Sequence, residues 1–119
     1  MQDFHKLKFW ERAHALTIDV YRITRDQFPK EEIYGQTSQI RRATASIATN
    51  IAEGCGRHTK IEFANFLNIA AGSASEVEYE ALLVKDTGYI TEEQYQHWVN
   101  EIQEIRCMIN NYMETLRKS

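Results

Sequence analysis

Four stretches of the chain repeat apolar residues at intervals of three and four, the spacing that places them on one face of an α-helix. The second stretch runs from about residue 37 to 54, and the third runs from 59 to 87. In the first stretch, residues 8–28, this face consists of Trp10, Ala13, Leu16, Val20, Ile23 and Gln27. In the fourth, which starts at 91, a heptad seam consists of Tyr95, Trp98, Ile102, Ile105, Ile109, Tyr112 and Leu116. No stretch shows the alternation of a β-strand, so the pattern predicts four helices.

The expected helix ends depend on hydroxyl side chains and glycines. Pro29 ends the first helix, and the hydroxyl of Thr37 or Ser38 is expected to cap the second. The glycines of the sequence GCG, residues 54–56, are expected to stop that helix in the left-handed conformation. Residues 59–62 and 91–94 each match a capping box, and Gly88 with Tyr89 closes the third helix. Because the connections are short, the sequence predicts an all-α, antiparallel up-down four-helix bundle, with residues 1–119 forming a single domain.

Composition narrows the class of protein. The chain contains no run of about 20 apolar residues and no signal-peptide pattern, which predicts a cytoplasmic protein without a membrane span. Cys55 and Cys107 form no CxxC motif, so a disulfide framework or a zinc site is not expected. The net charge of −3 is unevenly spread, because residues 1–60 contain 10 Lys and Arg against 7 Asp and Glu, while residues 61–119 contain 4 against 10. This leaves room only for a local basic patch.

The second predicted helix has more distinctive faces than a bundle core requires. Ile40, Ala43, Ile47, Ile51 and Gly54 share the face expected to be the core, and Ala45, Ala48 and Ala52 share a second. The third face is a polar stripe that consists of Gln39, Arg42, Ser46, Asn50, Glu53 and Arg57. On the third helix, Ser73, Glu76 and Glu80 form a matching polar set, and residues 71–75 are all small enough to let another helix approach closely.

Two interpretations of these polar residues compete. They form either a solvated face, whose ion pairs are worth about 0–1 kcal/mol each, or a partly buried network between helices or subunits, where loss of one partner costs about 3–5 kcal/mol. Short uncharged Ser46 and Asn50 stand among alanines, where a solvated helix would more commonly carry Lys and Glu. We therefore favour the network.

No complete catalytic or metal-binding constellation is present. A di-iron bundle requires two Glu-x-x-His motifs and two further glutamates, whereas only Glu11 and His14 match, off the core face. The chain contains no P-loop, nucleophile elbow or dinucleotide fingerprint. The sequence therefore predicts a protein that is not an enzyme, with no catalytic residues, cofactor, metal or small-molecule substrate.

Nucleic-acid binding is the main alternative to pure self-assembly. Four basic residues gather around the second helix and the turn after it: Arg41, Arg57, His58 and Lys60. An oligomer would repeat them, so that weak contacts with RNA or DNA add up. The competing interpretation is that these bases pair with Glu62, Glu76 and Glu80.

The chain also resembles a known family. The strings LKFWERAHAL, FPKEEIYGQTSQIRRATASIATNIAEGCGR, FLNIAAGSASEVEYEALLVKDTGYI and the terminal heptad segment are similar, in order and over nearly the whole chain, to bacterial four-helix bundle proteins encoded in intervening sequences of 23S ribosomal RNA genes. The resemblance implies an up-down bundle that assembles into a ring-like homopentamer with no established enzymatic activity. The residues that match the family pattern are Gln39, Arg42, Ser46, Asn50, Glu53, Gly54, Gly72, Ser73 and Glu76. The chain departs from the pattern at Gln36, where the family usually has Leu.

A distant relative of similar fold is the accessory protein of diversity-generating retroelements, a basic pentamer that works with a reverse transcriptase and binds nucleic acid. The present chain is acidic, with a net charge of −3. The expectation is therefore a non-enzymatic homo-oligomer that acts through assembly and partner binding, and the alternative is a nucleic-acid-associated accessory protein.

Overall fold

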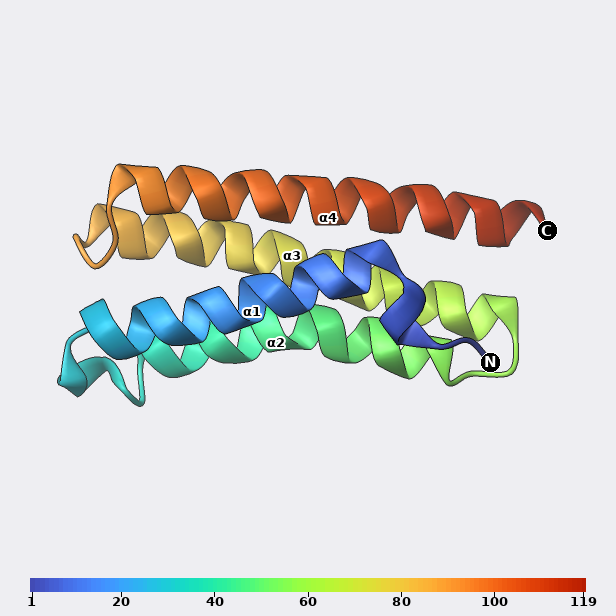
Figure 1. The fold of residues 1–119 in the computed structure, drawn as a ribbon, viewed down its shortest axis with the longest axis horizontal. Helices are drawn as coiled ribbons and strands as arrows, with labels where there is room; N and C mark the ends of the chain where they lie inside the picture. The colour runs from blue at the N-terminus through green and yellow to red at the C-terminus, as the bar shows by residue number, and fades with distance from the viewer.

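The computed structural model describes residues 1–119 and contains four long helices and no strand. The helices are α1 (Lys8–Gln27), α2 (Gln36–Cys55), α3 (Lys60–Asp86) and α4 (Glu92–Lys118), with short 3₁₀ turns η1 (Phe4–Lys6) and η2 (Lys30–Glu32). Each helix runs antiparallel to the one before it, along a body of 46 × 23 × 20 Å (Figure 1). The predicted all-α antiparallel four-helix bundle is confirmed. No helix is long and apolar enough to cross a membrane.

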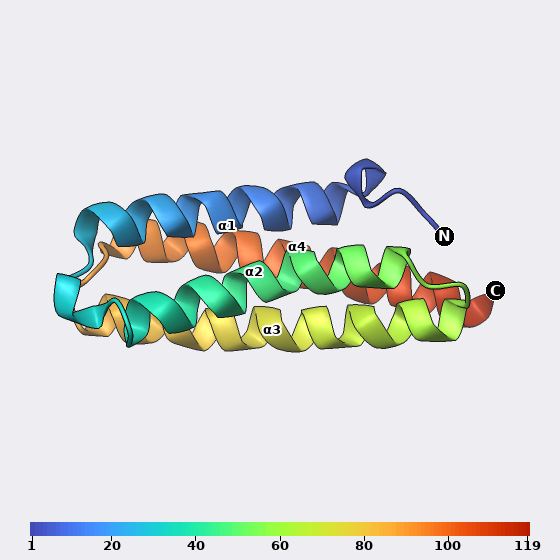
Figure 2. The ribbon, with the colours of Figure 1, turned by 90° about the horizontal axis from the view of Figure 1, so that it is seen from below.

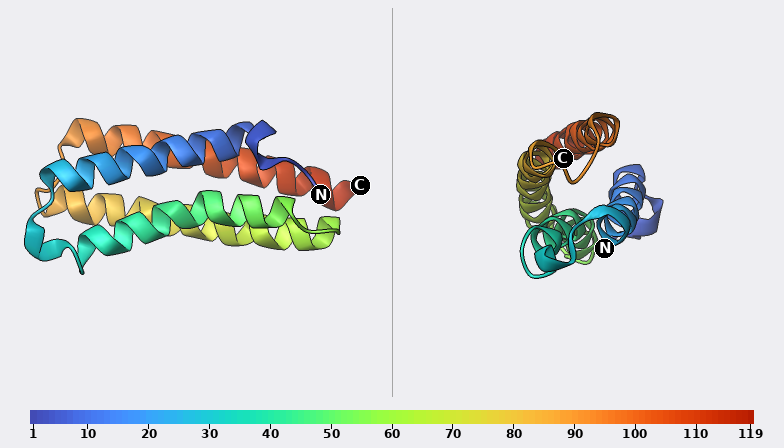
Figure 3. Two further views of the ribbon diagram at one scale, coloured as in Figure 1. Left: turned by 60° about the horizontal axis from the view of Figure 1, so that its bottom comes forward. Right: turned by 90° about the vertical axis from the view of Figure 1, so that its left-hand side faces the viewer.

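The helices surround one hydrophobic core in the order in which they occur in the chain. Viewed from the end, α1 and α2 form one side of the bundle, and α3 and α4 form the other (Figure 3). Figure 2 shows α2 and α3 side by side along their lengths. The expected core face of α2 is buried throughout, and so is the centre of the α4 seam. These buried residues are Ile40, Ala43, Ile47, Ile51, Gly54, Trp98, Ile102, Ile105 and Ile109.

The predicted core face of α1 is correct in its middle, is only partly buried at Trp10, which packs against the edge of the core, and is wrong at Gln27. Phe9, rather than Trp10, is buried, and its ring packs 5.4 Å from the ring of Tyr112. Trp10 is half-buried and stacks on His14, with 5.1 Å between ring centroids. Gln27 is exposed. Helical spacing alone does not choose between adjacent residues at the margin of a face, and the partner on α4 decides the choice here.

The start of α2 differs from the expected hydroxyl cap. Gly35 is the N-cap residue, and the Glu32 carboxylate accepts a hydrogen bond from the Gln36 amide at 3.1 Å. Thr37 is buried and Ser38 lies inside the helix, so neither caps it. The other oxygen of Glu32 accepts a hydrogen bond from the Tyr89 hydroxyl at 2.7 Å. The same carboxylate therefore caps α2 and ties it to the turn between α3 and α4.

The glycines that follow α2 do not act as expected. Gly56 is the C-cap residue with φ −82°, so the predicted left-handed stop is wrong. Gly54 has a packing role, because a Cβ built there would lie 2.8 Å from Cδ1 of Phe63. The left-handed glycine is Gly88, with φ +86°. It ends α3 with the expected closure, in which the Tyr89 amide donates to the Val84 carbonyl at 2.9 Å.

Both predicted capping boxes begin a helix, but only one is complete. At the start of α4, the Thr91 hydroxyl and the Gln94 side chain each accept the other residue's backbone amide. At the start of α3, the Thr59 hydroxyl accepts the Glu62 amide at 3.1 Å. The Glu62 carboxylate, however, accepts from the Thr59 hydroxyl and not from its amide. The box at the start of α3 is therefore only half formed.

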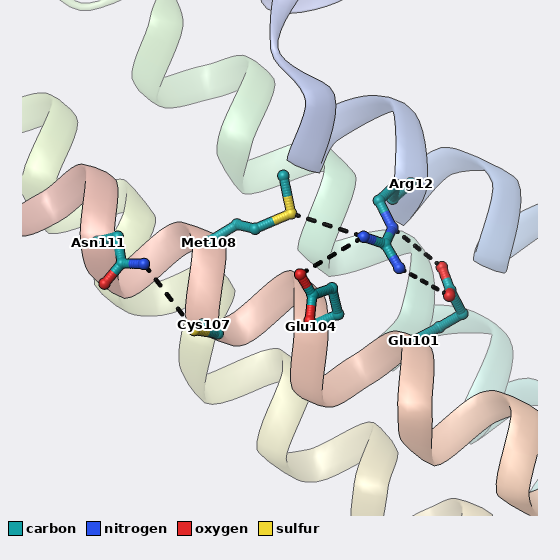
Figure 4. Close-up of polar contacts among 6 residues, drawn as sticks. All are labelled: Arg12, Glu101, Glu104, Cys107, Met108 and Asn111. Atoms are coloured by element: carbon teal, nitrogen blue, oxygen red, sulfur yellow. Dashed lines mark hydrogen bonds and ion pairs between the residues drawn. The ribbon is translucent and has the colours of Figure 1, made fainter.

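The seam between α1 and α4 closes the bundle. The Arg12 guanidinium donates to both oxygens of Glu101, at 3.2 and 2.8 Å, and lies 3.7 Å from Glu104 (Figure 4). Deeper in the seam, the buried Trp98 indole donates to an Asp19 oxygen at 2.8 Å. Side chains from the two ends of the sequence are thus held together by charge-assisted hydrogen bonds.

Candidate functional site on α2 and α3

Three of the predicted polar residues form a hydrogen-bonded cluster between α2 and α3. The hydroxyl oxygens of Ser46 and Ser73 lie 2.9 Å apart. The Asn50 side-chain amide donates to the Ser46 carbonyl at 2.8 Å and to the Ser46 hydroxyl at 3.0 Å. Ser73 is buried, and all three side chains are short. The cluster therefore links the two helices where their backbones come close.

The remaining residues of the predicted stripe on α2 make no bond to α3. Arg57, in the turn after α2, pairs with Glu53 near the end of that helix at 3.2 Å, and its guanidinium lies 4.7 Å from the centroid of the Phe66 ring on α3. Both charged groups are about half exposed, so this ion pair contributes at most about 1 kcal/mol. Gln39 and Arg42 are exposed. Whether a second molecule completes the network stays a prediction.

On α3, two glutamates stand near the cluster without partners. Glu76 is exposed. Glu80 is only 4% exposed, and neither of its carboxyl oxygens has a hydrogen-bond partner. Burial raises the pKa of Glu80 to about 7, with a further contribution from the Glu76 carboxylate, and Arg42 partly offsets the rise. A group that sequence reasoning placed in a satisfied network is thus buried and unpaired within one subunit.

The predicted basic residues lie in two places. Arg57, His58 and Lys60 line an open pocket of about 330 Å³ at the turn between α2 and α3. Arg41 lies on α2, 14 residues before the last residue of that helix, Cys55, which is about 21 Å away at ~1.5 Å per residue. Arg41 donates to the Thr24 hydroxyl at 2.8 Å. None of the four pairs with Glu62, Glu76 or Glu80, so the expected neutralisation across the helices does not occur within the chain.

The second face of α2 lines an open groove beside α1. Ala45, Ala48 and Ala52 are half-buried and line a depression of about 550 Å³, with Trp10 and His14 on the α1 side. Ala45 also lines a neighbouring depression of about 620 Å³ that reaches Tyr21, Ile33, Tyr34 and both arginines, Arg41 and Arg42. We call the two depressions together the α1–α2 groove. The sequence singled out these alanines as a surplus face, and the structure leaves that face open.

The titratable groups form no evident reaction centre. The structure contains no group of three or more His, Cys, Asp or Glu residues arranged to hold a metal ion. His14, the one histidine of the Glu-x-x-His match, stacks on Trp10 at the groove. Cys55 is buried, and burial raises the pKa of its thiol to about 11, so the thiol stays protonated at neutral pH.

The architecture defines a small all-α bundle with a bonded polar cluster between its central helices. The chain belongs to the family of 23S rRNA-intervening sequence proteins, whose family model matches residues 5–111. A solved structure with a similar fold is the crystal structure of a protein of unknown function from the S23 ribosomal protein family of Bacteroides thetaiotaomicron. It has a TM-score of 0.78 and 28% sequence identity, covering 88% of this chain and 97% of that chain. A comparison with curated proteins gives no match. Neither family description names an enzymatic activity.

Proposed function

We propose that the protein is a non-enzymatic homo-oligomer, assembled as a ring of five subunits, that acts by binding a partner through the assembled surface. The observation that carries the proposal is Glu80, a buried carboxyl group with no hydrogen-bond partner in its own chain. A buried polar group without a partner is destabilising, and native structures rarely retain one. Arg42 and Glu76, beside it, also lack an ion pair, so a second copy would supply the missing partners. The number five comes from the family resemblance.

Gel filtration coupled to light scattering tests the proposal on the purified full chain. A subunit of 13.9 kDa gives a pentamer of about 70 kDa. Glu76→Lys should lower this mass because it reverses a charge on the exposed surface of α3 beside Glu80. Glu114→Lys makes the same charge change at an exposed position near the end of α4, so it should leave the mass unchanged. A wild-type chain that is monomeric at micromolar concentration would overturn the proposal.

A second candidate function is association with RNA or DNA. It is supported by Arg57, His58 and Lys60, which meet at one end of the bundle without a carboxylate from another helix. A ring would bring several copies of this cluster together, which strengthens weak phosphate contacts. A gel-shift titration at several salt concentrations should give an affinity that falls steeply as salt rises. Lys60→Gln should weaken the shift more than Lys8→Gln, and no shift at low salt would remove this candidate.

A further inference from the structure

Gly72 occupies an unusual position in the middle of α3. It is exposed, and a Cβ built on it would meet no atom within 4 Å. Glycine inside a helix is less favourable than alanine because it loses more backbone freedom on folding. Packing within the subunit gives no reason for it, in contrast to Gly54, which Phe63 crowds. A surface glycine lets the backbone of another molecule approach the helix closely.

The surface around Gly72 is mixed, with exposed apolar side chains standing beside the exposed Asn68 and Glu76. Ile61, Ile69 and Tyr79 are 76%, 51% and 62% exposed. They lie 11 residues before, 3 before and 7 after Gly72, spacings that bring them near one side of the helix. We call these four residues the α3 outer face. It extends for about 27 Å at ~1.5 Å per residue.

The α1–α2 groove has a complementary shape. Its floor is made of short side chains of α2, the alanines together with Ser46 and Thr49, and its walls include Trp10 and Tyr21. Its two depressions share Ala45 and Thr49, so the groove is continuous along α2. A floor of short side chains admits a helix at the short interaxial distances of about 8–10 Å seen in tight helix packing.

The charges favour contact between these two different surfaces. Helix α3 contains five acidic residues and only two lysines, one near each end, although Glu78 pairs with Arg106 of α4 and Glu80 is buried. Arg41 and Arg42 stand at one depression of the groove, and Glu53 lines the other. Because α1 with α2 and α3 with α4 occupy opposite sides of the bundle (Figure 3), the two sides carry opposite net charge. Pairing the α3 outer face with itself would bring like charges together, and pairing it with the groove brings opposite charges together.

We propose that the α3 outer face of one copy docks in the α1–α2 groove of the next copy, head to tail. The inference rests on the proposed self-association and specifies its two surfaces. Docking places Gly72 against the alanine floor and brings the acidic α3 towards Arg42. Each copy keeps a free groove at one side and a free outer face at the other, so the contact propagates and closes into a ring where the rotation between copies permits.

Complementary blocked variants test the direction of the contact. Ala45→Trp fills the junction of the two depressions, and Gly72→Arg blocks the outer face. Each variant alone should be monomeric, because every contact needs one intact groove and one intact face. An equimolar mixture should form a dimer of about 28 kDa, twice the 13.9 kDa subunit, and stop there. Asn110→Arg, on the exposed side of α4, is the matched control and should assemble as the wild type does.

The outcomes separate this inference from the proposed function. A monomeric wild type overturns self-association itself. Two results with an assembling wild type overturn the head-to-tail contact and leave self-association standing. Either the blocked variants also assemble, or their mixture stays monomeric. Circular dichroism checks that each variant is helical, and Ala48→Gln is a smaller groove substitution if Ala45→Trp does not fold. Gly72→Ala should affect two measurements in opposite directions. It should raise the melting temperature of the dissociated subunit and reduce the assembled fraction.

Discussion

Replacing Glu80 with glutamine tests how much the buried, unpaired carboxyl group on α3 lowers the free energy of unfolding. Glu80 is 4% exposed, has no hydrogen-bond partner, and has a pKa raised from the ordinary 4.5 to about 7 by burial and by Glu76, with Arg42 acting in the opposite direction. Below pH 4.5 the folded and unfolded chains both hold the proton, so ionisation costs no stability. Between pH 4.5 and 7 the unfolded chain loses the proton first, and the free energy of unfolding therefore falls as the pH rises.

The size of the effect follows from the two pKa values. Each pKa unit corresponds to about 1.4 kcal/mol, so a rise from 4.5 to about 7 lowers the free energy of unfolding by about 3 kcal/mol once the pH exceeds 7. Glutamine keeps the shape of the side chain and cannot ionise. In the dissociated subunit, where Glu80 has no partner, Glu80→Gln should therefore be as stable as the wild type near pH 4.5 and more stable by up to about 3 kcal/mol at pH 8.

Urea denaturation followed by circular dichroism at pH 4.5, 6 and 8 measures this difference. Titrations at several protein concentrations separate subunit stability from any contribution of assembly. Glu114→Gln, at an exposed position, is the control and should show no comparable change with pH. A stability difference that is constant with pH, or a glutamine variant that is less stable at pH 8, would refute an unpaired, buried Glu80.

Three further substitutions test the packing of single residues. Gly54→Ala should lower the free energy of unfolding by about 1–3 kcal/mol, because the new Cβ would lie 2.8 Å from Phe63 Cδ1; an unchanged melting midpoint would contradict this. Gly72→Ala should raise it by up to about 1 kcal/mol in the dissociated subunit, since open space surrounds the position, and a lower midpoint there would oppose the reasoning. Trp98→Phe removes the donor to Asp19 and should cost about 1–3 kcal/mol in chemical denaturation, whereas equal stability would show that the bond contributes little.

Features set by local sequence were predictable. The spacing of Ile40, Ile47 and Ile51 identified the buried face of α2, because a core residue recurs every three or four positions whatever it packs against. The complete capping box at Thr91 and the closure of α3 at Gly88 were also predictable, since their bonds join residues within one or two turns. The hydrophobic pattern was thus sufficient for the bundle.

Features that depend on a distant partner were not predictable in the same way. The sequence pattern assigned Gly54 to a turn, but the structure shows that Phe63 on the neighbouring helix leaves no room for a Cβ at this position. The cap of α2 comes from Glu32, whose second oxygen binds Tyr89, 57 residues away. Helical spacing does not report such pairings.

The candidate site shows the same limit. Ser46 and Asn50 were rightly placed on one face, and the structure bonds Asn50 to Ser46 and Ser46 to Ser73. The sequence did not reveal that Glu80 would be buried without a partner, because its depth depends on how closely α2 and α3 approach. The small residues on the facing sides of the two helices, Ser46 and Gly54 on α2 and Ser73 on α3, were the available signal for that close approach.

The seam between α1 and α4 has a kinetic consequence. Among the four α-helices, every other pair in contact is consecutive in the chain, while Arg12 and Glu101 are separated by 89 positions. Closing a short connection sacrifices little chain entropy, so the consecutive hairpins form early, and helical proteins dominated by such contacts typically fold within milliseconds. The first and last helices meet late. The ion pair that joins them therefore governs how slowly the native bundle opens more than how rapidly it forms.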